Sequence, residues 1–152
     1  MQKRELKAAL LARLEIDLAA ARAAHAAAME GATHAEARPE NDKDTRGLEQ
    51  SYLARGHAQR VAELEAALVH VAVWQPRAFV ATEPVSIGAL IDLQEAGRTR
   101  RFLLATHGGG LTLGDDVTVL TPTSPIGRAV LGRSLDDEVE LGARILTITR
   151  LG

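Results

Sequence analysis

The chain has 152 residues, a formal net charge of −2 and no cysteine. A net charge so close to zero argues against general binding to nucleic acid or to membrane surfaces, and the lack of cysteine excludes disulfides and thiolate metal sites. The N-terminus runs directly into a charged amphipathic segment, and no run of about 18 apolar residues occurs. We therefore expect a cytoplasmic protein with no membrane partner and no sequence-specific DNA binding.

Two stretches in the first half of the chain carry apolar and small residues at alternating spacings of three and four, which is typical of the seam of a paired helix. The first seam is Leu11, Leu14, Leu18, Ala21, His25 and Ala28, and the second is Ala54, His57, Val61, Leu64, Leu68 and Val71. Taken in reverse order, the second seam pairs with the first about a single midpoint near Asn41, so one fold-back register satisfies every layer. This symmetry predicts an antiparallel helical hairpin, a coiled coil.

The predicted reversal of the hairpin falls in an acidic segment, residues 38–44, which contains Glu40, Asp42 and Asp44. Each arm of about 30 residues would extend roughly 45 Å at about 1.5 Å per residue, which is more than a compact domain needs to bury its own surface. We interpret the hairpin as a projection that carries carboxylates at its tip into a cavity of a partner. The alternative is that the acidic tip is an ordinary solvated loop.

The composition changes near Trp74-Gln75-Pro76, from an Ala-rich half with few glycines to a half rich in Gly, Val, Thr and Leu. We place a domain boundary there, which gives a hairpin domain at 1–75 and a second domain at 76–152. Short runs rich in Val, Ile, Leu and Thr, bounded by Gly, Asp or Pro, predict a small antiparallel β-sheet and hence an α+β fold. These runs span residues 85–93, 101–106, 116–121, 138–141 and 144–151.

A short helix is predicted between the third and fourth of these strands, at residues 124–132. Ser124 suits the N-cap, Pro125 suits the first helical position, and Gly132 suits the position just after the last turn. Both ends of a two-turn helix are therefore specified locally.

Three further patterns have structural interpretations that we prefer. His25 and His57 share a predicted layer, so a two-histidine metal site is conceivable there, but polar seam residues that fix the register are the simpler interpretation. Asp136 and Asp137 are expected to form a turn rather than a metal site. His107 precedes three glycines in a sequence that resembles the oxyanion hole of some lipases, but no Gly-x-Ser-x-Gly accompanies it. We therefore expect a flexible hairpin connection at that point.

Residues 124–139, Ser-Pro-Ile-Gly-Arg-Ala-Val-Leu-Gly-Arg-Ser-Leu-Asp-Asp-Glu-Val, closely resemble the signature of the GreA/GreB family of transcription elongation factors. In the C-terminal domain of that family, a Ser-Pro-hydrophobic-small-x-Ala-hydrophobic-hydrophobic-Gly run is followed by an acidic pair and valine. Residues 85–91 and 144–150 also resemble the first and last strands of that domain. The resemblance covers most of residues 80–152, and the predicted hairpin has the architecture of the family.

The resemblance implies a coiled-coil hairpin followed by an FKBP-like sheet domain that binds bacterial RNA polymerase. The globular domain would dock at the rim of the polymerase secondary channel through Ser124, Pro125 and Ile126, and the hairpin would enter the channel. The tip carboxylates would then help to hold a second Mg²⁺ beside the catalytic metal of the polymerase, so that a backtracked transcript is hydrolysed near its 3′ end. The protein would hold no metal stably by itself, and the polymerase would remain the enzyme.

The tip departs from the usual Gly-Asp-x-x-Glu-Asn pattern of the family, because Glu40 stands at the first acid but Lys43 at the second. Asp42 and Asp44 flank that lysine and are candidates to replace the missing carboxylate. An altered tip would alternatively occupy the metal unproductively and inhibit the polymerase. A further interpretation, from a different class, is a protein-interaction adaptor whose hairpin is a docking or dimerising rod.

Overall fold

The structure is a computed structural model that describes the backbone of residues 2–37 and 46–152, and the side chains of residues 2–31 and 48–152. The chain divides into two compact units, one formed by Met1–Leu11 with His70–Gly152 and the other by Ala12–Val69. The domain boundary predicted between residues 75 and 76 rests on composition and stays a prediction.

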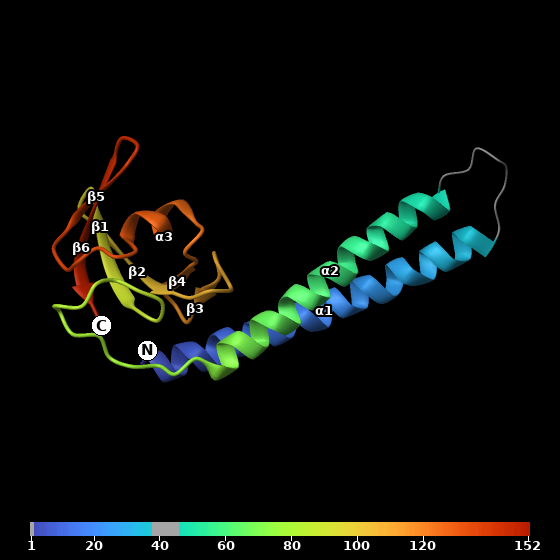
Figure 1. Ribbon diagram of the computed structural model, residues 1–152, viewed down its shortest axis with the longest axis horizontal. Helices are drawn as coiled ribbons and strands as arrows, with labels where there is room; N and C mark the ends of the chain where they lie inside the picture. Colours follow the sequence, from blue (N-terminus) through green and yellow to red (C-terminus); the bar gives the residue numbers. More distant parts are fainter. Residues whose placement is uncertain (1, 38–45) are drawn as a thin grey trace. The chain divides into compact units, whose positions relative to one another are not determined.

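The unit Ala12–Val69 contains most of two long helices, drawn in Figure 1 as α1 (Lys3–Ala37) and α2 (Arg46–Val73). Two observations show which parts of the helices lie next to each other. Arg22 Nη2 lies 3.1 Å from Glu65 Oε1, and a Cβ added to Gly31 would lie 3.2 Å from Oε1 of Gln50. Residue numbers on α2 fall as those on α1 rise from one contact to the other. The two helices therefore run antiparallel, as predicted. The second contact agrees with the predicted register, which places Gly31 opposite Ser51.

The predicted seams form the buried face of this helical pair. Every seam residue on both helices is buried or partly buried, and the side chains of Leu18 and Leu64, which share one predicted layer, retain only 6% and 2% of their exposure. Alanine seam residues nearest the tip are buried too, at Ala28 and Ala54. Since Ala, Leu, Glu and Arg also have high helix propensity, local preference and burial favour the same structure.

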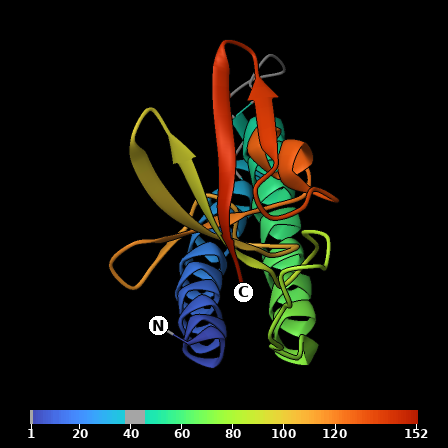
Figure 2. The ribbon, with the colours of Figure 1, turned by 90° about the vertical axis from the view of Figure 1, so that its left-hand side faces the viewer.

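The other unit contains a six-stranded sheet and one short helix, α3 (Pro125–Val130), which Figure 2 shows beside the strands. The sheet order is β3-β4-β2-β1-β6-β5. In chain order the strands are β1 (Leu90–Glu95), β2 (Arg98–Leu104), β3 (Thr112–Leu113), β4 (Val117–Leu120), β5 (Glu138–Leu141) and β6 (Arg144–Leu151). The predicted α+β fold, a helical hairpin followed by a small sheet domain with a short helix, is confirmed.

The sheet is mixed rather than wholly antiparallel, because β2 and β4 pair in parallel while the other neighbours are antiparallel. A parallel pair requires a crossover connection rather than a tight turn. Residues 105–116 provide it, and β3 forms within this connection. The prediction of a hairpin connection at His107-Gly108-Gly109-Gly110 is therefore wrong: these residues join β2 to β3, which are not neighbours in the sheet.

The first two strands extend further toward their shared turn than predicted. β1 and β2 are joined by Ala96 and Gly97, which both have positive φ, 47° and 76°, as a tight two-residue hairpin turn requires. The polar residues beside this turn lowered the strand signal, although cross-strand pairing continues as far as Glu95 and Arg98. The predicted first strand started too early, because β1 begins only at Leu90.

The core of this unit lies between the sheet and α3. It contains Phe79, Val85, Ala89, Ile91, Leu93, Phe102, Leu104, Leu120, Val130, Val139, Leu146 and Ile148. The start of α1 belongs to the same unit, where Leu6 and Leu10 are completely buried. Nearby, Lys3 Nζ donates to the carbonyl oxygen of Arg77 at 2.6 Å, and Lys7 Nζ donates to that of Trp74, also at 2.6 Å. None of the described helices has the length and apolar character needed to span a membrane.

Candidate functional site

The corner that leads into α3 is built around Ser124, as the sequence predicted. Ser124 has an extended backbone and caps the helix, because its Oγ accepts a hydrogen bond from the Gly127 backbone N–H at 3.1 Å. The same hydroxyl donates to the carbonyl oxygen of Thr121 at 2.8 Å. Pro125 occupies the start of the helix, where a backbone N–H has no intrahelical acceptor, so the lack of an N–H in proline costs nothing. The corner is thus held rigid by local chemistry.

Gly127 allows this corner to be unusually tight. A Cβ at this position would lie 1.9 Å from the carbonyl oxygen of Thr121 and 2.8 Å from Ser124 Oγ. No other residue fits without moving the backbone of the corner. The signature has a small residue at the position of Gly127, and packing inside the corner explains this requirement.

The three predicted docking residues have different surroundings. Pro125 is exposed, Ser124 is partly buried with its hydroxyl engaged in the cap, and Ile126 is partly buried against the core. This arrangement gives Ser124 a positioning function and leaves Pro125 and one side of Ile126 to form a surface. The role of these residues in docking stays a prediction.

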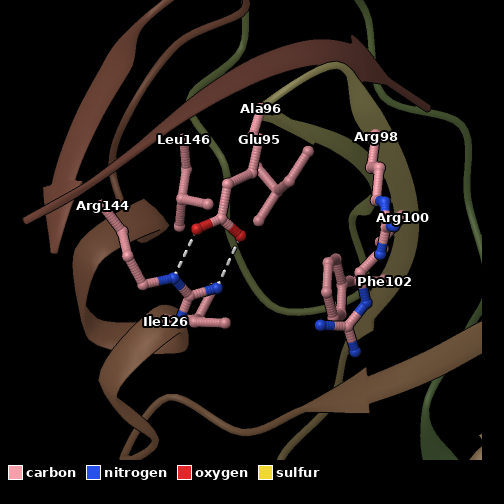
Figure 3. Close-up of a pocket in the computed structure, with 9 residues that line it drawn as sticks. Glu95, Ala96, Arg98, Arg100, Phe102, Ile126, Arg144 and Leu146 are labelled. Atoms are coloured by element: carbon pink, nitrogen blue, oxygen red, sulfur yellow. Dashed lines mark hydrogen bonds and ion pairs between the residues drawn. The ribbon is translucent and has the colours of Figure 1, made fainter.

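A pocket with a volume of about 510 Å³ lies next to Ile126 (Figure 3). Its apolar part is formed by Leu93, Phe102, Ile126 and Leu146. Its polar rim is formed by Glu95, Arg98, Arg100 and Arg144, from β1, β2 and β6. The pocket therefore joins an apolar floor to a rim on which basic side chains outnumber acidic ones.

Of the four charged rim residues, Glu95 and Arg144 form an ion pair with each other, whereas Arg98 and Arg100 take part in none among the described residues. Arg144 Nε and Nη2 donate to the two carboxylate oxygens of Glu95 at 2.6 Å and 2.7 Å. These hydrogen bonds lower the pKa of Glu95 and raise that of Arg144. Within the described part of the chain, Arg98 and Arg100 form no ion pair, although Arg100 lies over the Phe102 ring with Cζ 5.0 Å from its centroid. The rim keeps a net positive charge.

Sequence reasoning missed this pocket, because the hairpin of β1 and β2 forms it together with α3 and β6, which follow much later in the chain. The available signal was the run Arg98-Thr99-Arg100-Arg101, in which alternate residues of a strand point to one face of the sheet. Arg98 and Arg100 accordingly line the pocket, whereas Arg101 makes a bidentate ion pair with Asp92, at 2.7 Å and 3.0 Å.

The chain was compared with known proteins. No family model matches the sequence, and a search of curated proteins gives no match. Among solved structures, the chain matches GreA factor homolog 1 (Gfh1) of Thermus thermophilus with 18% sequence identity and a TM-score of 0.40, over 93% of this chain and 94% of that one. It matches Gfh1 of Thermus aquaticus with 19% identity and a TM-score of 0.40, over 91% of each chain. The similarity is to GreA factor homologues.

A further structure of the transcription factor Gfh1 matches with 17% identity and a TM-score of 0.41, over 94% of this chain and 93% of that one.

The three tip carboxylates that the GreA/GreB resemblance singled out, Glu40, Asp42 and Asp44, lie outside the described residues. Their role stays a prediction.

The remaining sequence candidates lie in the described regions. His25 and His57 are both partly buried, and the described residues contain no group of three or more His, Asp or Glu side chains placed to hold a metal. Asp136 has a positive φ of 70°, and the Asp137 carboxylate accepts a hydrogen bond from the Ser134 backbone N–H at 2.8 Å. The prediction of a turn at Asp136 and Asp137 is confirmed.

Proposed function

We propose that this protein is a bacterial transcription elongation factor that binds RNA polymerase at its secondary channel and changes the chemistry of the polymerase active site. The observation that carries the proposal is the GreA/GreB signature at residues 124–139, which coincides with a structurally specified corner. Ser124, Pro125 and Gly127 each have a distinct packing or capping reason at that corner. If the sequence matched the signature by chance, its residues would not be expected to have these structural roles.

The hairpin gives the proposal its second support. Residues 38–45 connect the end of α1 to the start of α2, and the two helices run antiparallel. The proposal takes up the sequence prediction that this acidic segment, which lies outside the described residues, forms the tip of the hairpin. A long helical pair with carboxylates at its tip would suit insertion into a channel that leads to a metal-dependent active site.

The proposed chemistry follows from the needs of a two-metal reaction. Two cations stabilise the attacking and leaving oxygens of phosphodiester hydrolysis, and the more weakly held Mg²⁺ needs additional oxygen ligands. Glu40, Asp42 and Asp44 would supply carboxylate oxygens to that ion. The protein itself would be an accessory factor, since the catalytic metal belongs to the polymerase.

Lys43 supports a second candidate, inhibition of the polymerase. Its ammonium group stands where the GreA/GreB resemblance places the second acid, and a cation beside a weakly held Mg²⁺ opposes binding of that ion. A tip that enters the channel without completing the metal site would slow the polymerase rather than stimulate cleavage.

The pocket beside Ile126 suggests the chemistry of the docking contact. An apolar side chain of the polymerase would occupy the floor near Phe102 and Ile126, and an acidic side chain next to it would pair with Arg98 or Arg100. Because Arg144 is already paired with Glu95, it would contribute less to this contact.

The decisive experiment uses a stalled, backtracked elongation complex with Mg²⁺, in which the length of the RNA is followed over time. We expect the protein to change either the shortening of the RNA at its 3′ end or the rate of its extension. In the triple variant Glu40→Ala, Asp42→Ala, Asp44→Ala, this effect should be lost while binding to the polymerase is nearly unchanged. Shortening would identify a cleavage factor, and slower extension without shortening would identify an inhibitor.

The matched control is the variant Glu15→Ala, Glu30→Ala, Glu63→Ala, which removes the same number of negative charges from described positions on the helices. It should keep the full effect. If the wild-type protein binds the polymerase but changes neither reaction, the adaptor interpretation is correct. If the protein does not bind the polymerase, the whole proposal fails.

A further inference from the structure

His70 and His107 form a close pair of imidazole rings within the sheet-containing unit. Nδ1 of His70 lies 2.7 Å from Nε2 of His107, and the ring centroids are 5.0 Å apart with an interplanar angle of 33°. His70 is in the last turn of α2, and His107 is in the connection between β2 and β3. The two residues are 37 positions apart in the sequence, so the fold rather than local geometry brings them together.

The two facing nitrogens can both become metal ligands. A neutral imidazole carries its proton on one ring nitrogen and a lone pair on the other. In the structure one of the two facing nitrogens donates a hydrogen bond to the other. If the proton of His70 moved to Nε2 and that of His107 to Nδ1, both facing nitrogens would carry a lone pair available to a metal ion. Burial lowers the pKa of His107, and the adjacent His70 lowers it further, which favours the neutral ring that a metal needs.

Metal binding requires the two nitrogens to move apart and the rings to turn until their lone pairs point at one ion. Zn–N bonds of about 2.0–2.1 Å in a tetrahedral site place two nitrogens about 3.3 Å apart, compared with 2.7 Å in the structure. Gly108, the residue after His107, packs closely against Leu10, because an added Cβ would lie 2.7 Å from Leu10 Cδ1. His70, in contrast, is exposed. The change would therefore come from rotation of the His70 side chain.

An apolar cavity lies beside His70. His70 lines a cavity of about 240 Å³ together with Leu10, Trp74, Ile87 and Leu104, among others. The cavity also places Trp74, the single tryptophan of the chain, near His70 as an optical probe.

We propose that His70 Nδ1 and His107 Nε2 bind a divalent transition-metal ion, such as Zn²⁺ or Cu²⁺, with water molecules completing the coordination shell. Imidazole nitrogen is a preferred ligand of these ions, and Cu²⁺ is expected to bind more tightly than Zn²⁺. No third His, Asp or Glu joins the pair within the described residues, so the site has open positions. The bound ion would link the end of α2 to the β2–β3 connection.

The test is a titration of the tag-free full-length protein with CuCl₂, followed by Trp74 fluorescence and by electron paramagnetic resonance. We expect saturable quenching with one ion per chain and a spectrum that shows two coordinating imidazole nitrogens. A parallel melt with ZnCl₂ should raise the unfolding temperature, because an ion that binds only the folded state stabilises it. His70→Ala and His107→Ala should each weaken Cu²⁺ binding at least tenfold.

The matched control is His25→Ala combined with His57→Ala, which removes two imidazoles from the helical pair and should leave binding unchanged. Circular dichroism establishes that each variant is folded. Equal Cu²⁺ affinity in wild-type and His107→Ala protein would overturn the proposal, as would loss of binding in the control. Because no polymerase is present, the outcome is independent of the proposed transcriptional function.

Discussion

At the scale of single residues, the sheet contains two ion pairs with the same geometry and different burial. Asp92 and Arg101 join β1 to β2 through two hydrogen bonds, and the Asp92 side chain is 12% exposed. Glu95 and Arg144 join the end of β1 to β6 in the same bidentate way, with the Glu95 side chain 32% exposed. Burial, rather than hydrogen-bond geometry, should decide how much each pair matters.

We predict that Arg101→Ala lowers the free energy of unfolding by about 1–3 kcal/mol, because it leaves the nearly buried Asp92 carboxylate without its partner. Urea denaturation followed by circular dichroism measures this loss. The double variant Asp92→Asn, Arg101→Ala should recover part of it, since the unpaired charge is gone. Arg144→Ala serves as the comparison and should cost less, because water reaches the partly exposed Glu95 carboxylate. Equal losses for Arg101→Ala and Arg144→Ala would contradict this explanation.

At the scale of elements, α3 shows how a short helix is fixed by its own ends. It spans only Pro125–Val130, too short to be stable by propensity. The Ser124 cap, Pro125 at the start and the absence of a side chain at Gly127 compensate for this length. Sequence reasoning identified the helix and both ends correctly, because these signals are local. It did not show that Gly127 is needed for a close approach to the Thr121 carbonyl, which depends on the preceding turn.

We predict that Gly127→Ala destabilises the sheet unit by about 1–3 kcal/mol, the usual cost of forcing a methyl group into a packed site. The added Cβ would meet the Thr121 carbonyl oxygen at 1.9 Å, so the corner must move. Urea unfolding of the full-length variant measures the loss. If the corner is the docking surface, this variant should also bind the polymerase more weakly.

The matched control for this substitution is Gly56→Ala in α2, where an added Cβ meets no atom within 4 Å. There the higher helix propensity of alanine should stabilise the protein by about 0.5–1 kcal/mol. An identical sign for the two substitutions would show that the close approach at Gly127 has no energetic consequence.

At the scale of the whole molecule, the compact units do not coincide with the change in composition. Met1–Leu11 belongs to the same unit as the sheet, with Leu6 and Leu10 fully buried and Lys3 and Lys7 bonded to carbonyls that follow α2. Helical periodicity assigns these residues to α1 and cannot reveal which surface they contact. Their burial is a property of the tertiary structure.

We predict that a fragment of residues 76–152 is less stable than the same sheet in the full-length chain. In the full chain, Leu6→Ala should shift stability in the same direction, by about 2–5 kcal/mol, as for other leucine truncations in a core. Hydrogen exchange of the amides in β1 and β6 measures the stability of the sheet in each protein. Leu18→Ala, in the other unit, should affect these amides less. Equal protection in the fragment and in the full chain would support the composition-based boundary instead.

Features that depend on periodicity and on local chemistry could be predicted from the amino-acid sequence. The antiparallel helical pair follows from two seams that mirror each other, and the α3 corner follows from Ser124, Pro125 and Gly132, because helix faces and caps depend on residues only a few positions apart. Three other features depend on the packing of the whole fold. They are the parallel pairing of β2 with β4, the pocket beside Ile126 and the contact of His70 with His107. Each of these brings together residues from separate elements, and no short-range pattern encodes their distance.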